Sequence, residues 1–539
     1  MNFKFTPLRF ALLLALLIFA VFPQVILGLQ TFVVRDYGFF VYPLAHFQRD
    51  CFWRGKIPFW DPYNNCGIPF LAQWNTMPLY PPSLIYLLLP MPWSLSFFAL
   101  LHLWFAGLGM FFLARRWTGN LFAAAFAGVA FSFNGFTLNL LIWPSHMATF
   151  SWMPWVVLAV ELAWLDGGRK FFLAAIAGAS QMLAGGPEII FLTWILLLAF
   201  WIQQFVKCES PRGKMFWRFP VVVLLVIALA AAQLFPFLDL VAHSQRNLGY
   251  ADFRWSMPLR GLANFLVPMA FGTTHNVGVF FQYGQSWTSS YYPGIGTLWL
   301  ALLAVWIVRE RRVRLLGAAA IVSLLFALGG NTFVLPAVRK IIPQLSFITY
   351  PVKYILLAIF IAPLLAAFAL TRLQNFQNEP KRNFQKPLAF FGIVLFVLIA
   401  AILFWAWRFP LPGDNVHATL LNGLSRAAFL ILTGAIFFAL AKKSESKIFR
   451  LAPLILIFVA WLDVLTHEPP QNPTAQPWVY QSDLARAKLA LQPQPALGQS
   501  RLMLSPIAQI NFIRFASDSP QNNFLAKRIG YCANINLLD

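Results

Sequence analysis

The stretch VVRDYGFFVYPLAHFQRDCFWRGKIPFWDPYNNCGIPFLAQWNTMPLYPPSLIYLLLP, from Val33 to Pro90, follows an apolar run near the N-terminus. It carries the three carboxylates of Asp36, Asp50 and Asp61, together with many aromatic residues and prolines. Such a polar segment cannot lie exposed in lipid, because its charges and free backbone groups would be desolvated there. The prolines also make it too stiff for a slack linker. We therefore expect an ordered loop outside the membrane.

The composition around this loop is that of a membrane protein. The 539-residue chain is 59% hydrophobic with a mean hydropathy of +0.67, and only 11% of its residues are charged, against about 25% in soluble proteins. Apolar runs long enough to cross a bilayer as helices recur along its whole length. We predict an all-α polytopic membrane protein that lies in the lipid bilayer and binds no nucleic acid.

The hydropathy pattern places about thirteen transmembrane helices. The first apolar run is too long for the apolar core of a signal peptide and no small-residue cleavage site follows it, so we interpret it as an uncleaved span. The short run 84–89 is broken by prolines and is expected to be interfacial or re-entrant. The predicted spans are 10–32, 94–114, 121–142, 146–165, 171–186, 188–206, 219–240, 293–308, 313–330, 353–371, 388–408, 424–441 and 450–466.

Charge orients these spans. With the N-terminus inside, the inner segments hold more than half of the 40 Lys and Arg residues, as the positive-inside tendency requires. The net charge of +22 therefore reflects basic residues at span ends. We predict a cytoplasmic N-terminus and an extracytoplasmic C-terminus.

The predicted topology divides the chain into two parts. The first is a transmembrane domain, 1–466, with a large first extracytoplasmic loop, 33–93. The second is a short extracytoplasmic segment, 467–539, which could be an incomplete small domain.

The first loop offers candidate site residues. Asp36 is expected at the outer end of the first span, where an ionisable group suggests function; the alternative is a helix-end carboxylate solvated by headgroups. Asp61 lies between Trp60 and Tyr63 in a proline-bounded turn, and aromatic faces next to a carboxylate suit a sugar. An interfacial aromatic belt would explain the same aromatics without a ligand.

Other candidates lie beyond the first loop. Glu188 follows a Gly-Gly-Pro break at the outer face and could bind substrate or stabilise the start of a helix. Arg339, Lys340 and Lys353 are outer basic residues that run against the charge bias. An anionic lipid phosphate would explain them, and so would snorkelling at a helix end.

Several kinds of chemistry find no support. The four cysteines form no CxxC pair and the histidines show no metal-ligand spacing, so we predict no metal and no cofactor. Cys51 and Cys66, both in the first loop, could form a disulfide or stay as thiols. The chain has no P-loop and no dinucleotide fingerprint. Nucleotide sugars are absent outside the membrane, so sugar chemistry there would need a lipid-linked donor.

The first loop resembles the signature of the YfhO-like family of bacterial membrane proteins. Further resemblance lies in Asp36 with Tyr42-Pro43, in LAGGPE (183–188), LGGNTFVLP (328–336), TYPVKY (349–354) and DVLTHEPPQNPT (463–474). Two family positions differ, since Gly186 replaces a histidine and Thr349 an arginine. The matching loop residues are Gly55, Lys56, Pro58, Trp60, Pro62, Gly67, Pro69, Tyr80, Pro81 and Pro90.

This family is similar to GT-C type glycosyltransferases. The resemblance implies an enzyme of the bacterial cytoplasmic membrane that transfers a sugar, with inversion, from a polyprenyl-phosphate donor to a cell-envelope glycan or lipid acceptor, with Asp36 as general base. In this hypothesis Asp61 and Glu188 orient sugar hydroxyls, and Lys353 with Arg339 or Lys340 stabilises the phosphate. Two alternatives stay open: a transporter or flippase for lipid-linked sugars, and a non-catalytic scaffold for envelope assembly.

Overall fold

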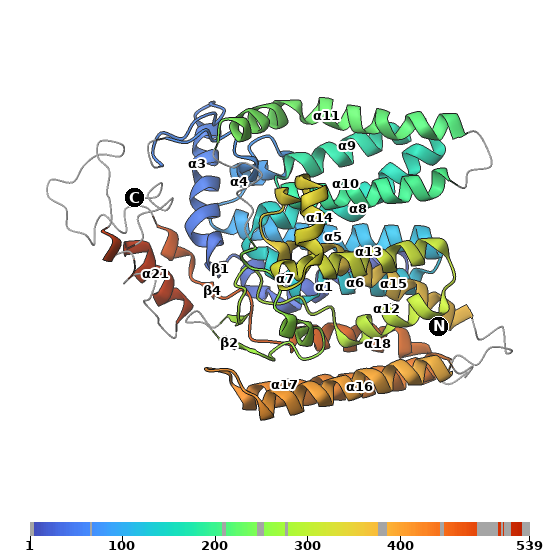
Figure 1. Ribbon diagram of the computed structural model, residues 1–539. Helices are drawn as coiled ribbons and strands as arrows, with labels where there is room; N and C mark the ends of the chain where they lie inside the picture. The colour runs from blue at the N-terminus through green and yellow to red at the C-terminus, as the bar shows by residue number, and fades with distance from the viewer. Residues whose placement is uncertain are drawn as a thin grey trace.

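Every apolar range predicted as a span contains a helix in the computed structural model (Figure 1). The structure describes residues 5–64, 67–206, 212–244, 253–274, 279–375, 385–441, 447–481, 505–507, 510 and 519–530. The long and medium helices are α1 (Pro7–Val21), α5 (Trp93–Thr118), α6 (Leu121–Ser132), α8 (Pro144–Asp166), α9 (Lys170–Leu183), α10 (Pro187–Phe205), α11 (Arg212–Ala242), α12 (Ile295–Ile307), α13 (Arg311–Ala327), α15 (Ile355–Asn375), α16 (Gln385–Arg408), α17 (Val416–Ala441) and α18 (Lys447–Leu465).

Not every helix in the described ranges is long enough to cross a membrane. Within the described ranges, seven helices are long and apolar enough to cross a membrane, or up to eight if the bent run from α6 to Ile142 forms one span. The other predicted spans form shorter helices, such as α9 and α12. The chain is thus a helical membrane protein, and thirteen crossings stay a prediction.

The helices pack as a stack around two central members. α5 contacts α1, α6 and α8, while α15 contacts α6, α12 and α13. Most of α15 is buried within the protein, which is why its apolar residues continue around the whole helix. α9 and α11 flank one side of the stack, and α16 and α17 flank the other (Figure 1).

The first helix ends earlier than the sequence suggests. We predict a span over 10–32, but α1 stops at Val21, and a single turn, α2 (Pro23–Ile26), follows. Pro23 has no backbone N–H to continue the α1 ladder, and Gly28 turns the chain with a φ of 74°. The chain then enters a short strand that leads directly to Asp36.

Short elements gather at one end of the stack (left in Figure 1) around α3 (Tyr42–Trp53) and α4 (Ile85–Leu88). The remaining helical turns are α7 (Gly135–Asn139), α14 (Val334–Ile341), α21 (Pro520–Gly530), the π-helix η1 (Tyr37–Val41) and the 3₁₀ turns η2 (Trp74–Thr76), η3 (Pro81–Leu84), η4 (Leu140–Ile142), η6 (Leu259–Phe265), η7 (Gly329–Asn331), η8 (Pro343–Phe347), η9 (Pro351–Tyr354) and η11 (Pro477–Tyr480).

Two small antiparallel sheets also lie in this region, so the all-α prediction needs a minor correction. β1 (Thr31–Phe32) pairs with β4 (Thr474–Ala475), and β2 (Gly272–Thr274) pairs with β3 (Phe280–Gln282). Strands of two or three residues are too short to show a period of two in the sequence. The β1–β4 pairing joins segments more than 400 residues apart.

The C-terminal segment packs against the first loop. Besides the β1–β4 pair, the Tyr480 hydroxyl donates to the carbonyl of Phe32 at 2.8 Å, and the Tyr480 ring stacks on Tyr42 with centroids 3.8 Å apart. Arg528 of α21 is buried and donates from Nη2 to the carbonyl of Gln481 at 2.6 Å. The described part of residues 467–539 therefore supports the loop that carries Asp36.

Candidate functional site

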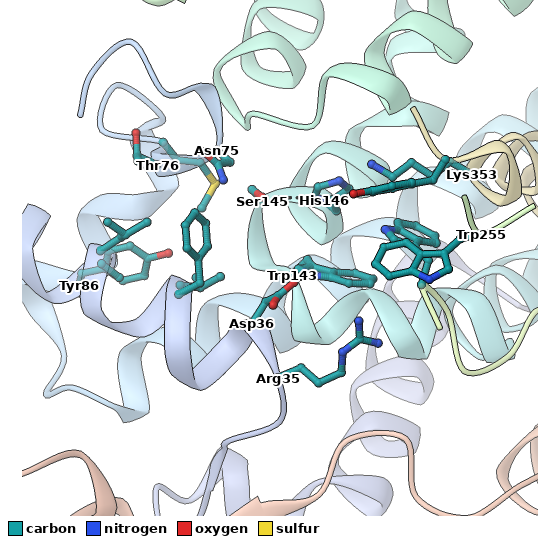
Figure 2. Close-up of a pocket in the computed structure, with 17 residues that line it drawn as sticks. Arg35, Asp36, Asn75, Thr76, Tyr86, Trp143, Ser145, His146, Trp255 and Lys353 are labelled. Atoms are coloured by element: carbon teal, nitrogen blue, oxygen red, sulfur yellow. Dashed lines mark hydrogen bonds between the residues drawn. The ribbon is translucent and has the colours of Figure 1, made fainter. Parts of the chain in front are cut away.

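A cavity of about 320 Å³ lies beside Asp36, between the first loop and the ends of several helices (Figure 2). One wall is formed by η1, α3 and the segment Asn75–Met77 of the first loop. The opposite wall comes from the start of α8 and from η9. The residues lining it are Arg35, Asp36, Phe40, Val41, Leu44, Ala45, Asn75, Thr76, Met77, Tyr86, Trp143, Ser145, His146, Trp255, Trp287, Tyr350 and Lys353.

Asp36 is held by the local backbone and by one strong hydrogen bond. It lies directly before η1, and Arg35 ahead of it has a left-handed φ of 52°, a conformation uncommon outside glycine. The indole Nε1 of Trp143 donates to Asp36 Oδ2 at 2.5 Å. Trp143 in turn stacks on Trp287, with ring centroids 4.9 Å apart. The carboxylate therefore has a fixed orientation in the cavity.

Arg35 brings a positive charge to the same cavity. Its Nη1 donates to the carbonyl of Ser286 at 2.8 Å, and its guanidinium lies 5.2 Å from the ring centroid of Phe281. Burial lowers the pKa of the Arg35 guanidinium, and the neighbouring Asp36 carboxylate opposes this shift. An anion entering the cavity would meet a poorly solvated cation, which strengthens their attraction.

Lys353 provides a second cation on the opposite wall. It lies in η9, is buried, and places its Nζ 2.5 Å from Oε1 of Glu188. His146 stands on the other side of this carboxylate, with Nε2 3.8 Å from Glu188 Oε2. The ammonium also lies 5.3 Å from the ring centroid of Trp287. Figure 2 shows Lys353 on the same side of the cavity as His146 and Asp36 turned toward Trp143.

Close packing of the α9–α10 turn against the first loop places Glu188 next to Lys353. Gly185 has a φ of 83°, and a Cβ there would come within 2.2 Å of the carbonyl oxygen of Trp74. Pro187 then starts α10, with Glu188 in its first turn. The Gly-Gly-Pro break therefore lets the first loop rest on the α9–α10 turn, and it supplies the partner of Lys353.

The structure does not bring the aromatic turn of the first loop into this cavity. Asp61 is fully buried and its Oδ1 accepts a hydrogen bond from the backbone N–H of Tyr63 at 2.9 Å. Its backbone pairs with Ile68. Trp60 is exposed and covers Gly67, and Tyr63 meets Phe47 edge to face. In this arrangement Asp61 shapes the turn, and sugar contacts by these three residues stay a prediction.

The two basic residues of α14 also lie apart from the cavity lining. Arg339 is buried, and its Nη2 donates to the carbonyl of Ile348 at 2.8 Å, with its guanidinium 5.0 Å from the ring centroid of Phe253. Lys340 is exposed. Of the three predicted phosphate-binding residues, only Lys353 lines the cavity.

Sequence reasoning missed Arg35, Trp143, His146 and Trp287. Arg35 could have been found, because it is an outer-face basic residue adjacent to Asp36. Trp143 and His146 belong to the stretch WPSH, in which Pro144 starts α8. This pattern reads as an ordinary helix start with an aromatic residue at the interface. Nothing in the sequence places Trp287 opposite Trp143, 144 positions earlier.

The cysteine-pairing and metal-site predictions depend on which residues the structure describes. Cys51 lies half-buried on α3, and Cys66 lies outside the described residues, so their pairing stays untested. Across the described ranges, no group of three or more His, Cys, Asp and Glu side chains could hold a metal ion.

Comparison with solved structures identifies the fold. Two structures of ArnT from Cupriavidus metallidurans are similar to this chain, and one of them is bound to undecaprenyl phosphate. That one is 13% identical with a TM-score of 0.52, and the match covers 98% of this chain and 86% of ArnT. The apo structure is 14% identical with a TM-score of 0.51, covering 97% and 87%.

At such identities the likeness shows the fold alone, which is GT-C-like. No protein-family model matches the chain, and no curated protein matches it. The resemblance to the YfhO-like family therefore stays a prediction, whereas the GT-C-like architecture is supported over nearly the whole chain.

Proposed function

We propose that this protein is an inverting membrane glycosyltransferase that uses a polyprenyl-phosphate sugar donor. The observation that carries the proposal is the cavity in which Asp36 lies with Arg35 and Lys353, inside a fold shared with a protein that has been crystallised with undecaprenyl phosphate. A carboxylate suits proton transfer, and the two cations suit a phosphate. The donor sugar and the envelope acceptor are left open.

The reaction uses the cavity residues as follows. Asp36 takes the proton from a hydroxyl of the acceptor, and the hydroxyl oxygen attacks the anomeric carbon. The bond between that carbon and the phosphate oxygen breaks, and the polyprenyl phosphate leaves with the electron pair. Lys353 and Arg35 stabilise its negative charge. In this proposal Arg35 stabilises the phosphate, a role that the sequence had suggested for Arg339 or Lys340.

Glu188 serves as the counterion of Lys353 within the protein. Glu188 balances the ammonium while no phosphate is bound, and His146 flanks the same carboxylate. A phosphate oxygen would compete with Glu188 for the ammonium. We therefore assign Glu188 to positioning Lys353, in place of the direct sugar contact suggested by the sequence.

The test is a transfer assay with the purified full chain, a polyprenyl-phosphate hexose and candidate envelope acceptors. We expect release of polyprenyl phosphate that depends on the acceptor. Asp36→Asn should keep donor binding and lose turnover by about 10²–10⁴-fold, the range for general base catalysis. Full turnover by this variant would remove Asp36 from the base role. Movement of a lipid-linked sugar across proteoliposomes without any transfer would favour the transporter alternative.

A further inference from the structure

A second and larger cavity, of about 800 Å³, lies between the ends of α1 and α18 and the chain that follows α18. We call residues His467–Thr474, with the sequence HEPPQNPT, the strap. This cavity shares no lining residue with the Asp36 cavity. Its lining residues are Ala20, Val21, Phe22, Pro23, Gln24, Val25, Gln30, Leu138, Val464, Leu465, His467, Glu468, Pro469, Pro470, Gln471, Asn472, Pro473, Thr474 and Pro520.

The two sides of this cavity differ in polarity. The ends of α1 and α18 contribute apolar side chains such as Val21, Phe22 and Leu465. The strap contributes a carboxylate, two amides and an imidazole. Pro469, Pro470 and Pro473 fix the strap backbone, so these polar groups cannot easily turn away. A cavity with one apolar and one polar wall at a helix end suits an amphiphile.

The polar wall holds hydrogen-bond acceptors without donors. Among the described residues, no hydrogen bond reaches either oxygen of Glu468, and the same holds for Gln471 Oε1 and Asn472 Oδ1. The Ser289 hydroxyl lies close to the Glu468 carboxyl but donates to Asn139 Oδ1 at 2.9 Å. The two amides are oriented by their own donors. Gln471 Nε2 donates to the carbonyl of Gly135 at 2.8 Å and Asn472 Nδ2 donates to that of Leu138 at 2.9 Å.

The nearest imidazole does not supply the missing donor. His467 Nε2 lies 3.6 Å from Glu468 Oε1, but its Nδ1 faces the carbonyl of Val464 and therefore carries the proton. Nε2 is then an acceptor, and the Ser290 hydroxyl donates to it at 2.9 Å. Burial lowers the pKa of His467 to about 3, so the ring is neutral at neutral pH.

The nearby cation is also committed elsewhere. Arg426 pairs with Asp463 through Nη1 at 2.5 Å, and its Nη2 donates to Thr466 Oγ1 at 2.8 Å. The side chain of Glu468 is only 1% exposed, and burial raises the pKa of its carboxyl well above the ordinary value. A buried acceptor left without a donor is destabilising, so a ligand that donates hydrogen bonds would stabilise this wall of the cavity.

We propose that this cavity binds an amphiphile whose head group donates hydrogen bonds to Glu468 and whose chain lies along the ends of α1 and α18. A primary ammonium and sugar hydroxyls both provide this chemistry. The site is separate from the transfer reaction and does not depend on it. The ligand is therefore a lipid that the protein binds in addition to its donor.

The test compares lipids that differ only in their head groups. The purified full chain is titrated with dioleoyl phosphatidylethanolamine, monohexosyl dioleoylglycerol and dioleoyl phosphatidylcholine, and bound lipid is measured by native mass spectrometry. Phosphatidylcholine is the matched control because its ammonium has no N–H donor. We expect at least one donor-bearing lipid to bind about ten-fold more tightly than phosphatidylcholine. Equal binding of all three lipids would overturn the proposal.

Two variants locate the binding. Glu468→Leu removes the acceptor and should reduce the preference to less than two-fold, whereas Asp239→Asn, at an exposed carboxylate on α11, should leave it unchanged. Ala20→Trp fills the cavity from its exposed apolar edge and leaves the strap intact, so it should weaken binding of the preferred lipid. Unchanged binding by Ala20→Trp would contradict the proposal even if Glu468→Leu failed to fold. The readout is binding, so the result stands whatever the transfer assay shows.

Discussion

The Asp36 cavity and the strap cavity each contain one prominent carboxylate, but the neighbours of the two acids differ. Asp36 accepts a hydrogen bond from Trp143 and shares its cavity with Arg35 and Lys353. Among the described residues, no hydrogen bond reaches Glu468, because the nearby Ser289 hydroxyl donates to Asn139 and Arg426 is paired with Asp463. The first arrangement suits an anion beside a proton acceptor; the second suits a donor-bearing head group. The hydrogen-bond donors and cations around a carboxylate therefore indicate its function better than its degree of burial does.

The two cavities are joined by one short sheet. The strap ends in β4, which pairs with β1, and β1 leads within four residues to Asp36. One continuous piece of backbone therefore borders both sites. The following predictions test whether the cavities differ as proposed, in order of decreasing expected effect.

After Asp36→Asn, the largest effect is expected at Lys353. Lys353→Met removes one of the two cations proposed to stabilise the phosphate and should lower kcat about 10²–10³-fold, the loss seen when one stabilising group for a developing charge is removed. Turnover of the purified variant in the transfer assay measures this. Lys340→Met is the matched control, since Lys340 is exposed outside the cavity lining, and it should retain activity. Equal losses in both variants would return the phosphate role to α14.

A smaller effect is expected at Trp143. Trp143→Phe keeps an aromatic ring but deletes the N–H that orients Asp36. We expect kcat to fall about 10- to 10²-fold, since a lost hydrogen bond to a charged group is worth roughly 1.5–3 kcal/mol. Donor affinity should change little, because the indole nitrogen faces the carboxylate. Trp306→Phe, at an exposed tryptophan, controls for the substitution. A change in KM with constant kcat would place Trp143 in substrate binding.

The third prediction concerns the packing of the C-terminal segment on η1. A Cβ at Gly38 would come within 2.4 Å of the Phe524 ring of α21. Gly38→Ala should therefore lower the free energy of unfolding by about 1–3 kcal/mol through overpacking, measured by denaturation in detergent. In a Phe524→Ala background the same glycine substitution should cost less stability, and a double-mutant cycle measures this partial recovery. Without any recovery, the contact between α21 and η1 would not be the cause.

The smallest effect on turnover is expected in the strap cavity. Glu468→Gln keeps the size of the side chain and should change kcat less than two-fold, in contrast to the large loss expected for Asp36→Asn. Its effect should appear instead as a weaker preference for donor-bearing lipids. A ten-fold loss of turnover, with lipid binding intact, would mean that the two cavities serve one reaction.

The sequence predicted the larger pattern well because that pattern is local. Every apolar range that hydropathy located contains a helix, and the Gly-Gly-Pro break correctly separated α9 from α10. It also identified two residues that line the Asp36 cavity, Asp36 and Lys353. Asp61, by contrast, looked like a site residue because prolines and aromatics surround it, while the same features serve to build a tight turn around its carboxylate.

The rest of the site depends on contacts between distant segments. Glu188 meets Lys353 across 165 positions, and Trp143 meets Asp36 across 107. The β1–β4 pair that brings the strap beside the Asp36 segment spans more of the chain still. Composition and periodicity fix which residues enter a helix or a bilayer, since those depend on near neighbours. Which carboxylate receives a donor or a cation is decided only when the helices pack.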